Sequence, residues 1–439
     1  MNATSSQPKG LGPIIIIGVL FFAFGFITWA NSQLIPYLKI ACQLTDTQSY
    51  LVASAFFAAY FITSIPSSHI LKKTGYKKGM SLGLTIMALG AIIFIPAANT
   101  RSFPLFLTGL FIQGTGLSLL QTASNPYVTI LGPISSAAQR ISIMGICNKV
   151  AGILAVLILG GITLKNADQF TAGLKLMDDA SKAVALNELA QRVVTPYIVI
   201  TAALVALAVI LLFMHLPEVV EEANKEESTL NGATTAKTSV LQYPHLVLGA
   251  IAIFFYVGVE VMSYDTFSTL GTTVGYTLDS AKTFAAVTGI AMLAGYLLSI
   301  VLIPKVVSQR AGLIFATLVC ILLVTLASVL KGSPDIKYLN LGFEKLNIPL
   351  HPATVCFALL GFFNSIMWPA IWPLSLDRLG RFTKIGGALL IMGIVGGAVL
   401  PPLYGALSAA MGSAQLGYII MIPCYLYILF FAVKGYKAT

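Results

Sequence analysis

Three charged side chains lie inside long apolar stretches of this 439-residue chain. Lys149 follows Asn148 in one stretch, and Glu260 and Asp265 lie in another. A charge at the centre of a membrane helix costs about 2.5–3.5 kcal/mol on insertion scales, so each needs a partner or a wet cavity. Since five residues at 100° each place the two acids about 140° apart, at most one of them faces a shared cavity squarely.

Two kinds of chemistry fit these charges. One acid and Lys149 could form an ion pair that switches between two helix bundles, or the acid could bind a coupling cation. The alternative is a static pair that only holds the bundles together, although buried pairs are weak stability devices. The candidate coupling residues are Glu260, Asp265 and Lys149.

Amide side chains accompany the charges. Gln121 and Asn125 are four residues apart and share a helix face, and Asn148 and Lys149 belong to a second such stripe. An amide both donates and accepts, as a sugar hydroxyl does, whereas the alternative role is hydrogen bonding between helices. The full set of expected substrate contacts is Asn31, Gln33, Gln121, Asn125, Asn148, Lys149, Asn364 and Trp368.

The chain has three tryptophans, Trp29, Trp368 and Trp372. Trp368 precedes Pro369 and follows Asn364 by four residues, a position that suits a flat platform for the apolar face of a sugar ring. The alternative role is that of an interfacial belt tryptophan, which fits Trp372 better.

The elements that hold these residues must be membrane helices. The composition is 57% hydrophobic and 10% charged, against about 25% charged in soluble chains. We expect an all-α integral membrane protein with twelve spans, each near or above the roughly 20 residues that cross a bilayer. The predicted spans are 11–38, 48–71, 79–98, 102–131, 138–163, 193–216, 244–273, 280–304, 311–331, 350–376, 385–408 and 413–433.

Charge in the short loops predicts the orientation. If the N-terminus is cytoplasmic, the short inside connections and the tails hold 13 Lys and Arg residues, and the short outside connections hold 3. The longer loops 164–192, 217–243 and 332–349 are left out of this count, because long loops cross a membrane regardless of charge. Both termini are therefore expected in the cytoplasm.

The chain also divides in two. Residues 1–216 and 244–439 each hold six predicted spans, and the polar segment 217–243 is read as a cytoplasmic linker. Short motifs recur in order, with FFxxG beginning at Phe21 and again at Phe254, and IMGI beginning at Ile143 and again at Ile391. Duplication of this kind is typical of transporters with a midplane site between two bundles.

Four segments resemble a known family. They are LIPYLK from Leu34, LQTASNPYVTILGP from Leu120, IMGICNK from Ile143 and FFNSIMWP from Phe362. Together they are similar to the fucose–galactose–glucose cation symporter family of the major facilitator superfamily, over essentially all twelve spans. The resemblance implies two pseudo-symmetric six-helix bundles, alternating access, and uptake of a monosaccharide with H⁺ or Na⁺.

The chain departs from that family at two positions. Fucose–proton members carry an Asp where this sequence has Ser32 and a Glu where it has Gln121, whereas the family's helix-5 Asn matches Asn148. The coupling acid is therefore expected at Glu260 or Asp265, or sodium replaces the proton. The segment ITWANSQ from Ile27 looks more like the glucose/galactose and N-acetylglucosamine branch.

Other functional classes fit less well. An exporter or uncoupled facilitator of the same fold remains an alternative, and a transporter-like sensor would need a larger soluble domain. No HExxH, His cluster or nucleophile elbow indicates an enzyme, and no cofactor or metal site is expected. The expected partners are a sugar, a coupling cation and the bilayer, with no nucleic acid, for a monomer in a bacterial cytoplasmic membrane.

Overall fold

The computed structural model describes residues 11–130, 137–214, 216, 239–303, 306–331, 338–340, 346–379 and 382–438. Most of the predicted linker 217–243 lies outside these ranges. So do Lys9, Lys305 and Arg381 from the loop-charge count, and the side chain of Lys384.

The N-terminal half, residues 11–216, is a group of long helices. They are α1 (Leu11–Ala41), α3 (Leu51–Ile92), α5 (Phe103–Ile130), α6 (Ala137–Thr163) and α9 (Val194–Phe213), and α3 packs against both α5 and α9. Shorter elements follow or precede them: α2 (Asp46–Ser49), α4 (Phe94–Thr100), α7 (Ala167–Leu174) and α8 (Asp179–Gln191). The segment 164–192, predicted only as a loop, thus contains two helices.

The C-terminal half, residues 239–438, is also built of helices packed side by side. Its long helices are α10 (Pro244–Asp265), α13 (Phe284–Leu302), α14 (Gln309–Val329), α15 (Pro352–Leu376), α16 (Thr383–Met392), α17 (Gly396–Ala410) and α19 (Met421–Val433). The shorter elements are η3 (Val240–Gln242), α11 (Phe267–Thr273), α12 (Leu278–Ala281), η5 (Gly393–Val395), α18 (Ala414–Gly417), η6 (Tyr418–Ile420) and η7 (Gly435–Lys437). Strands β1 (Tyr338–Asn340) and β2 (Asn347–Pro349) pair antiparallel, with Leu339 opposite Ile348.

Eleven helical segments of the described chain are long and apolar enough to cross a membrane. One of them, Asp46–Thr100, contains 55 residues, far more than one crossing needs. Within it, Gly75 has φ 74° and ψ 173°, a conformation that ends one helix and starts another. Counted as two, this segment brings the spans to twelve and confirms the predicted all-α membrane fold.

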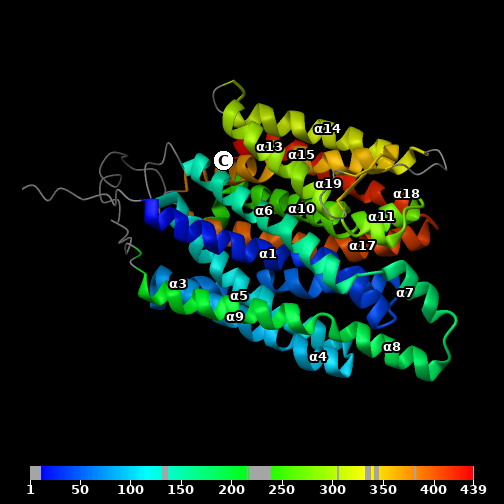
Figure 1. Ribbon diagram of the computed structural model, residues 1–439. Helices are drawn as coiled ribbons and strands as arrows, with labels where there is room; N and C mark the ends of the chain where they lie inside the picture. Colours follow the sequence, from blue (N-terminus) through cyan, green and yellow to red (C-terminus); the bar gives the residue numbers. More distant parts are fainter. Residues whose placement is uncertain are drawn as a thin grey trace, which may run out of the picture.

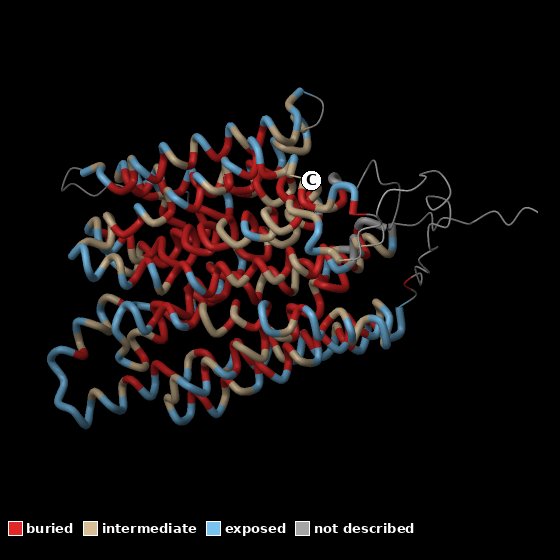
Figure 2. The backbone as a smooth tube through the Cα atoms, turned by 180° about the vertical axis from the view of Figure 1, so that it is seen from behind, coloured by how far each residue is buried: buried red, intermediate tan, exposed pale blue. Residues whose placement is uncertain are grey.

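The outer surface of the bundle is apolar, as lipid contact requires. Large side chains such as Phe61, Phe213, Leu297 and Phe315 are exposed, while the buried residues lie between the helices (Figure 2). Helices satisfy their own backbone groups, so such a surface can face hydrocarbon.

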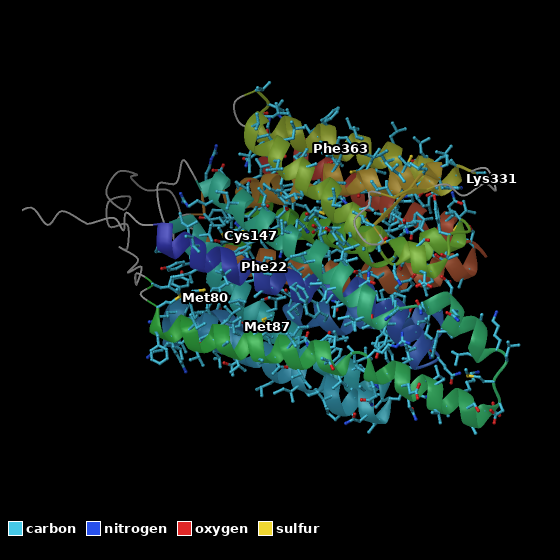
Figure 3. All side chains as sticks on the ribbon, in the orientation of Figure 1. Phe22, Met80, Met87, Cys147, Lys331 and Phe363 are labelled. Atoms are coloured by element: carbon cyan, nitrogen blue, oxygen red, sulfur yellow. The ribbon has the colours of Figure 1, made fainter. Side chains whose placement is uncertain are left out.

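The two ends of the bundle differ. The C-terminus lies at one end, which we call the C-terminal end, and α7, α8, α11 and α18 lie at the other, which we call the α7 end (Figure 1). Lys331, which follows α14, also lies at the α7 end (Figure 3).

Close packing of α1 on α6 positions the central residues. A side chain at Gly25 would lie 2.4 Å from the carbonyl oxygen of Asn148, and one at Gly152 would lie 2.6 Å from the Trp29 ring. Phe22 of α1 and Cys147 of α6 mark the same contact in Figure 3. Because these glycines have no side chain, the helices approach until Trp29 reaches the polar stripe of α6.

Candidate functional site

A cavity of about 110 Å³ lies between the two halves. Six of the predicted site residues line it: Gln121, Asn125, Asn148, Lys149, Glu260 and Trp368. Aromatic side chains from α1, α3, α10 and α13 complete the wall, including Phe21, Phe24, Phe57, Tyr60, Tyr256 and Tyr296. The cavity therefore combines amides, one charge of each sign and ring faces, which together can hold a polar molecule with an apolar face.

An ion pair crosses this cavity. Lys149 Nζ lies 2.7 Å from Glu260 Oε1, and the two side chains are 4% and 9% exposed. The contact joins α6 of the N-terminal half to α10 of the C-terminal half. The Lys149 ammonium also lies 3.8 Å from the centroid of the Trp29 ring and 5.4 Å from that of the Tyr264 ring. Cation–π interactions with both rings therefore help to stabilise the buried charge.

Trp29 is a site residue that the sequence prediction did not include. Its Nε1 donates a hydrogen bond to Asn148 Oδ1 at 2.9 Å, and its ring stacks on Tyr264 with centroids 4.0 Å apart. Trp29 thus contacts the amide, the ammonium and the opposite half. Its rarity in the sequence was the available signal, since it is one of only three tryptophans.

The remaining polar wall comes from α5 and α15. Gln121 Nε2 donates to the Tyr60 hydroxyl at 3.0 Å, which fixes the amide toward the cavity. Trp368 lines the cavity and stacks on Trp372, with centroids 5.3 Å apart, but Trp372 is not part of the cavity wall. The prediction of an interfacial belt position for Trp372 is wrong, because this residue is only 7% exposed and belongs to the buried core.

Three predicted sugar contacts lie elsewhere. Asn364 is fully buried within the C-terminal half, where its Oδ1 accepts hydrogen bonds from the Tyr425 hydroxyl and the Cys320 thiol. Gln33 Nε2 donates to the Lys282 carbonyl near the α7 end, and Asn31 is buried without lining the cavity. These residues correct the prediction, because a polar type in a span does not by itself specify a cavity-facing direction.

The two acidic residues of α10 lie in different environments. Glu260 lines the cavity, whereas Asp265 is 1% exposed and does not. The angle between them on the helix predicted that at most one would face it squarely, and this is confirmed.

At the α7 end, a reciprocal pair of carboxylates, which we call the clasp, joins the two halves. Asp168 accepts from the backbone N–H groups of Leu278 and Asp279, at 3.0 and 2.7 Å. Asp279 in turn accepts from the N–H groups of Ala167 and Asp168, both at 3.2 Å. Each half therefore caps the first turn of a short helix in the other half.

Lys282 strengthens the clasp. Its Nζ donates to the Leu164 carbonyl at 2.8 Å and to Asp279 Oδ1 at 2.6 Å, and its own carbonyl accepts from Gln33. Beside the clasp, a vestibule of about 720 Å³ opens between the halves, with Lys39, Tyr50, Ser268 and Tyr404 among its lining residues.

Comparisons with known proteins agree with this architecture. The model of the Major Facilitator Superfamily matches residues 17–401. The chain is 35% identical to a "Glucose/galactose transporter" of Brucella abortus biovar 1 (strain 9-941), covering 99% of this chain and 97% of that protein. It is 30% identical to an "L-fucose-proton symporter" of Escherichia coli (strain K12), covering 96% and 92%.

Solved structures show the same likeness. A Major Facilitator Superfamily transporter, FucP, in the outward conformation superposes with a TM-score of 0.72 at 29% identity, covering 96% of this chain and 97% of that one. A bacterial homolog to the human lysosomal transporter Spinster, inward-facing, gives a TM-score of 0.63 at 16% identity, which supports the fold alone. The chain belongs to the Major Facilitator Superfamily of membrane transporters, and within it to the fucose–galactose–glucose cation symporter family.

Proposed function

We propose that this protein takes up a monosaccharide by symport with a cation, through alternating access of the central cavity. The observation that carries the proposal is the Lys149–Glu260 ion pair, which joins the halves inside a cavity walled by amides and aromatic rings. Lys149 and Glu260 can bind a polar substrate and also link the two halves. Binding of substrate in the cavity is therefore coupled to movement of the halves relative to each other.

Glucose or galactose is the first substrate class to test, because the relatives from Brucella abortus and Helicobacter pylori carry those sugars in their names. N-acetylglucosamine and fucose are the further candidates. Gln121, Asn125 and Asn148 offer donors and acceptors to hydroxyls, and Trp368 offers a ring face. Gln33 and Asn364 instead form hydrogen bonds with other helices or loops, and Asn31 is buried outside the cavity wall.

The ion pair is the proposed switch. A sugar hydroxyl that hydrogen-bonds to Glu260 or Lys149 competes with their contact across the halves, so binding loosens one closed arrangement and stabilises another. The residues proposed to take part in coupling are Lys149, Glu260 and Asp265, with H⁺ or Na⁺ as the coupling ion.

The orientation follows from the loop charges. We place the C-terminal end in the cytoplasm of a bacterial cell and the α7 end outside the cytoplasmic membrane, with the protein acting as a monomer. In this orientation the clasp closes the outer entrance, and it must break each time the cavity opens to the outside.

Uptake of radiolabelled glucose, galactose, fucose and N-acetylglucosamine by proteoliposomes tests the proposal. A cation falling through 100 mV supplies about 2.3 kcal/mol, which supports roughly 50-fold accumulation. We expect accumulation of at least one sugar that needs an inward Na⁺ or H⁺ gradient and is abolished by an ionophore. Equilibration that ignores every gradient would identify an uncoupled facilitator, and no saturable movement of these sugars would refute the proposal.

A further inference from the structure

Asp265 is a buried carboxyl group that the proposed sugar site does not use. It is 1% exposed, and neither of its carboxylate oxygens has a hydrogen-bond partner in the described structure. No Lys, Arg or His of the described chain forms an ion pair with it. An ionised carboxylate without a partner is costly to bury, so a group in this position is stable only as the neutral acid or with a bound cation.

The position of Asp265 along α10 places it between two spaces. Val261, four residues earlier, lines the central cavity, and Ser268, three residues later in α11, lines the vestibule. Val261 and Asp265 are four apart in α10 and share a helix face, and Ser268 follows in the next helix, so Asp265 lies between a cavity residue and a vestibule residue along this segment. This part of the helix is broken at Thr266, whose φ is −104° and ψ 0°.

This face lies on the seam between the halves. A side chain at Gly397 would contact both Val261 of α10 and Phe57 of α3, so the N-terminal half packs directly over this side of α10. One turn toward the α7 end, the hydroxyl of Tyr50, the residue just before α3, donates to Thr269 across the same seam. Separation of the halves at the α7 end would therefore bring water from the vestibule to Asp265.

The titratable groups around this turn are tyrosines, and none of the described ion pairs includes Asp265. The nearest in sequence is Tyr264, whose ring stacks on Trp29 and whose hydroxyl has no hydrogen-bond partner in the described structure. Tyr418 donates to the Thr266 carbonyl, Tyr404 donates to the Ala414 carbonyl, and Tyr50 donates to Thr269. On the vestibule side, Lys39 and Asp46 pair with each other. On the cavity side, Lys149 and Glu260 pair with each other.

We infer that Asp265 is the proton-carrying site of the transport cycle, separate from the sugar-binding ion pair, and that the coupling ion is H⁺. The inference rests on the proposed symport. With the α7 end open, a proton from water in the vestibule forms an O–H bond on an Asp265 carboxylate oxygen, and the neutral acid is then buried as the seam closes. After the protein opens to the other side, that O–H bond breaks and the proton passes to water there, so one proton crosses with the sugar.

Proteoliposomes with a pH-sensitive dye inside test this inference. In wild type, adding D-glucose or D-galactose outside should acidify the lumen as the sugar enters. Asp265→Asn should reduce this sugar-dependent acidification at least tenfold, yet keep sugar counterflow within about threefold of wild type, because counterflow moves no net proton. Asp265→Glu should restore proton movement in part, and Asp46→Asn, which removes a vestibule carboxylate, should leave it intact.

The outcomes separate the inference from the proposed function. Full sugar-dependent acidification in Asp265→Asn, or accumulation by wild type that follows Na⁺ without acidification, overturns the role of Asp265 while symport stands. Movement of sugar that no gradient drives overturns symport itself.

A labelling test on wild type avoids any folding defect of the variants. Dicyclohexylcarbodiimide reacts with protonated carboxyl groups in apolar surroundings, and mass spectrometry locates the adduct. We expect the adduct on Asp265. Sugar-dependent acidification should fall in proportion to the fraction of Asp265 that is labelled. Labelling of Glu260 with Asp265 unmodified would contradict the inference.

Discussion

The ammonium of Lys149 lies 2.7 Å from the carboxylate of Glu260, and this contact ties α6 to α10 across the two halves of the protein. Both side chains are almost wholly buried, so each charge depends on the other for its compensation.

Neutralising one member of the pair should destabilise the protein more than neutralising both. Lys149→Met or Glu260→Gln leaves an uncompensated buried charge, which costs about 3–5 kcal/mol, whereas the double variant leaves none. Unfolding in detergent, analysed as a double-mutant cycle, measures the coupling. Each single variant should also lose most sugar counterflow. Additive stability losses would show that the two charges do not interact.

Trp368 and Trp372 form a matched pair on α15, because each loses the same mutual stack when it is replaced. Trp368→Leu removes a ring face from the cavity wall and should weaken sugar binding about fivefold, the effect of roughly 1 kcal/mol. Trp372→Leu should change the Kd less than twofold, since Trp372 does not line the cavity. Equilibrium binding of labelled sugar measures both, and equal losses would count against Trp368 as a sugar contact.

Asn148 and Asn364 should behave differently although both are amides in spans. Asn364→Ala leaves the buried Tyr425 hydroxyl without its acceptor and should cost about 1–3 kcal/mol of stability, with sugar affinity unchanged. Asn148→Ala removes the acceptor of Trp29 Nε1 and a group of the cavity wall, so it should lower affinity as well. Thermal melting and equilibrium sugar binding, measured on both variants, compare their losses of stability and of affinity. Weaker sugar binding by Asn364→Ala would place that residue in the site.

Removing a clasp carboxylate should open the α7 end. Asp168→Ala or Asp279→Ala deletes two hydrogen bonds between the halves, so the open population should rise severalfold. Faster thiol labelling of a cysteine introduced by Ser268→Cys in the vestibule would report this opening. Asp178→Ala is the control, because Asp178 caps α8 within its own half. An unchanged labelling rate in both clasp variants would mean that other contacts hold this end closed.

Much of this fold could be predicted from hydropathy alone. The twelve spans follow from apolar length, and the non-helical conformation of Gly75 explains why the 55-residue segment Asp46–Thr100 counts as two of them. Asn148 and Lys149 of the α6 stripe both lie on the cavity wall, because helical periodicity converts spacing into a shared face. The same periodicity predicted that Glu260 and Asp265 point in different directions from their helix.

The direction of a single polar side chain was harder to predict. Asn364 lies four residues before Trp368, yet only Trp368 lines the cavity, because Asn364 accepts hydrogen bonds from Tyr425 of α19 and Cys320 of α14. Trp29 became a site residue because Gly152 admits its ring and Tyr264 stacks on it, two contacts between separate helices. Asp168 and Asp279 form the clasp between segments far apart in the sequence. The loop-charge rule counts only Lys and Arg, so nothing in the sequence predicted this pairing.

The most direct measurement is the structure of this protein with glucose or galactose bound. The sugar ring should lie in the central cavity over Trp368, within hydrogen-bonding distance of Gln121 and Asn148, and beside Lys149 and Glu260. A sugar seated in the vestibule near Tyr50 and Tyr404, with the central cavity holding only water, would contradict the assignment of the transport site.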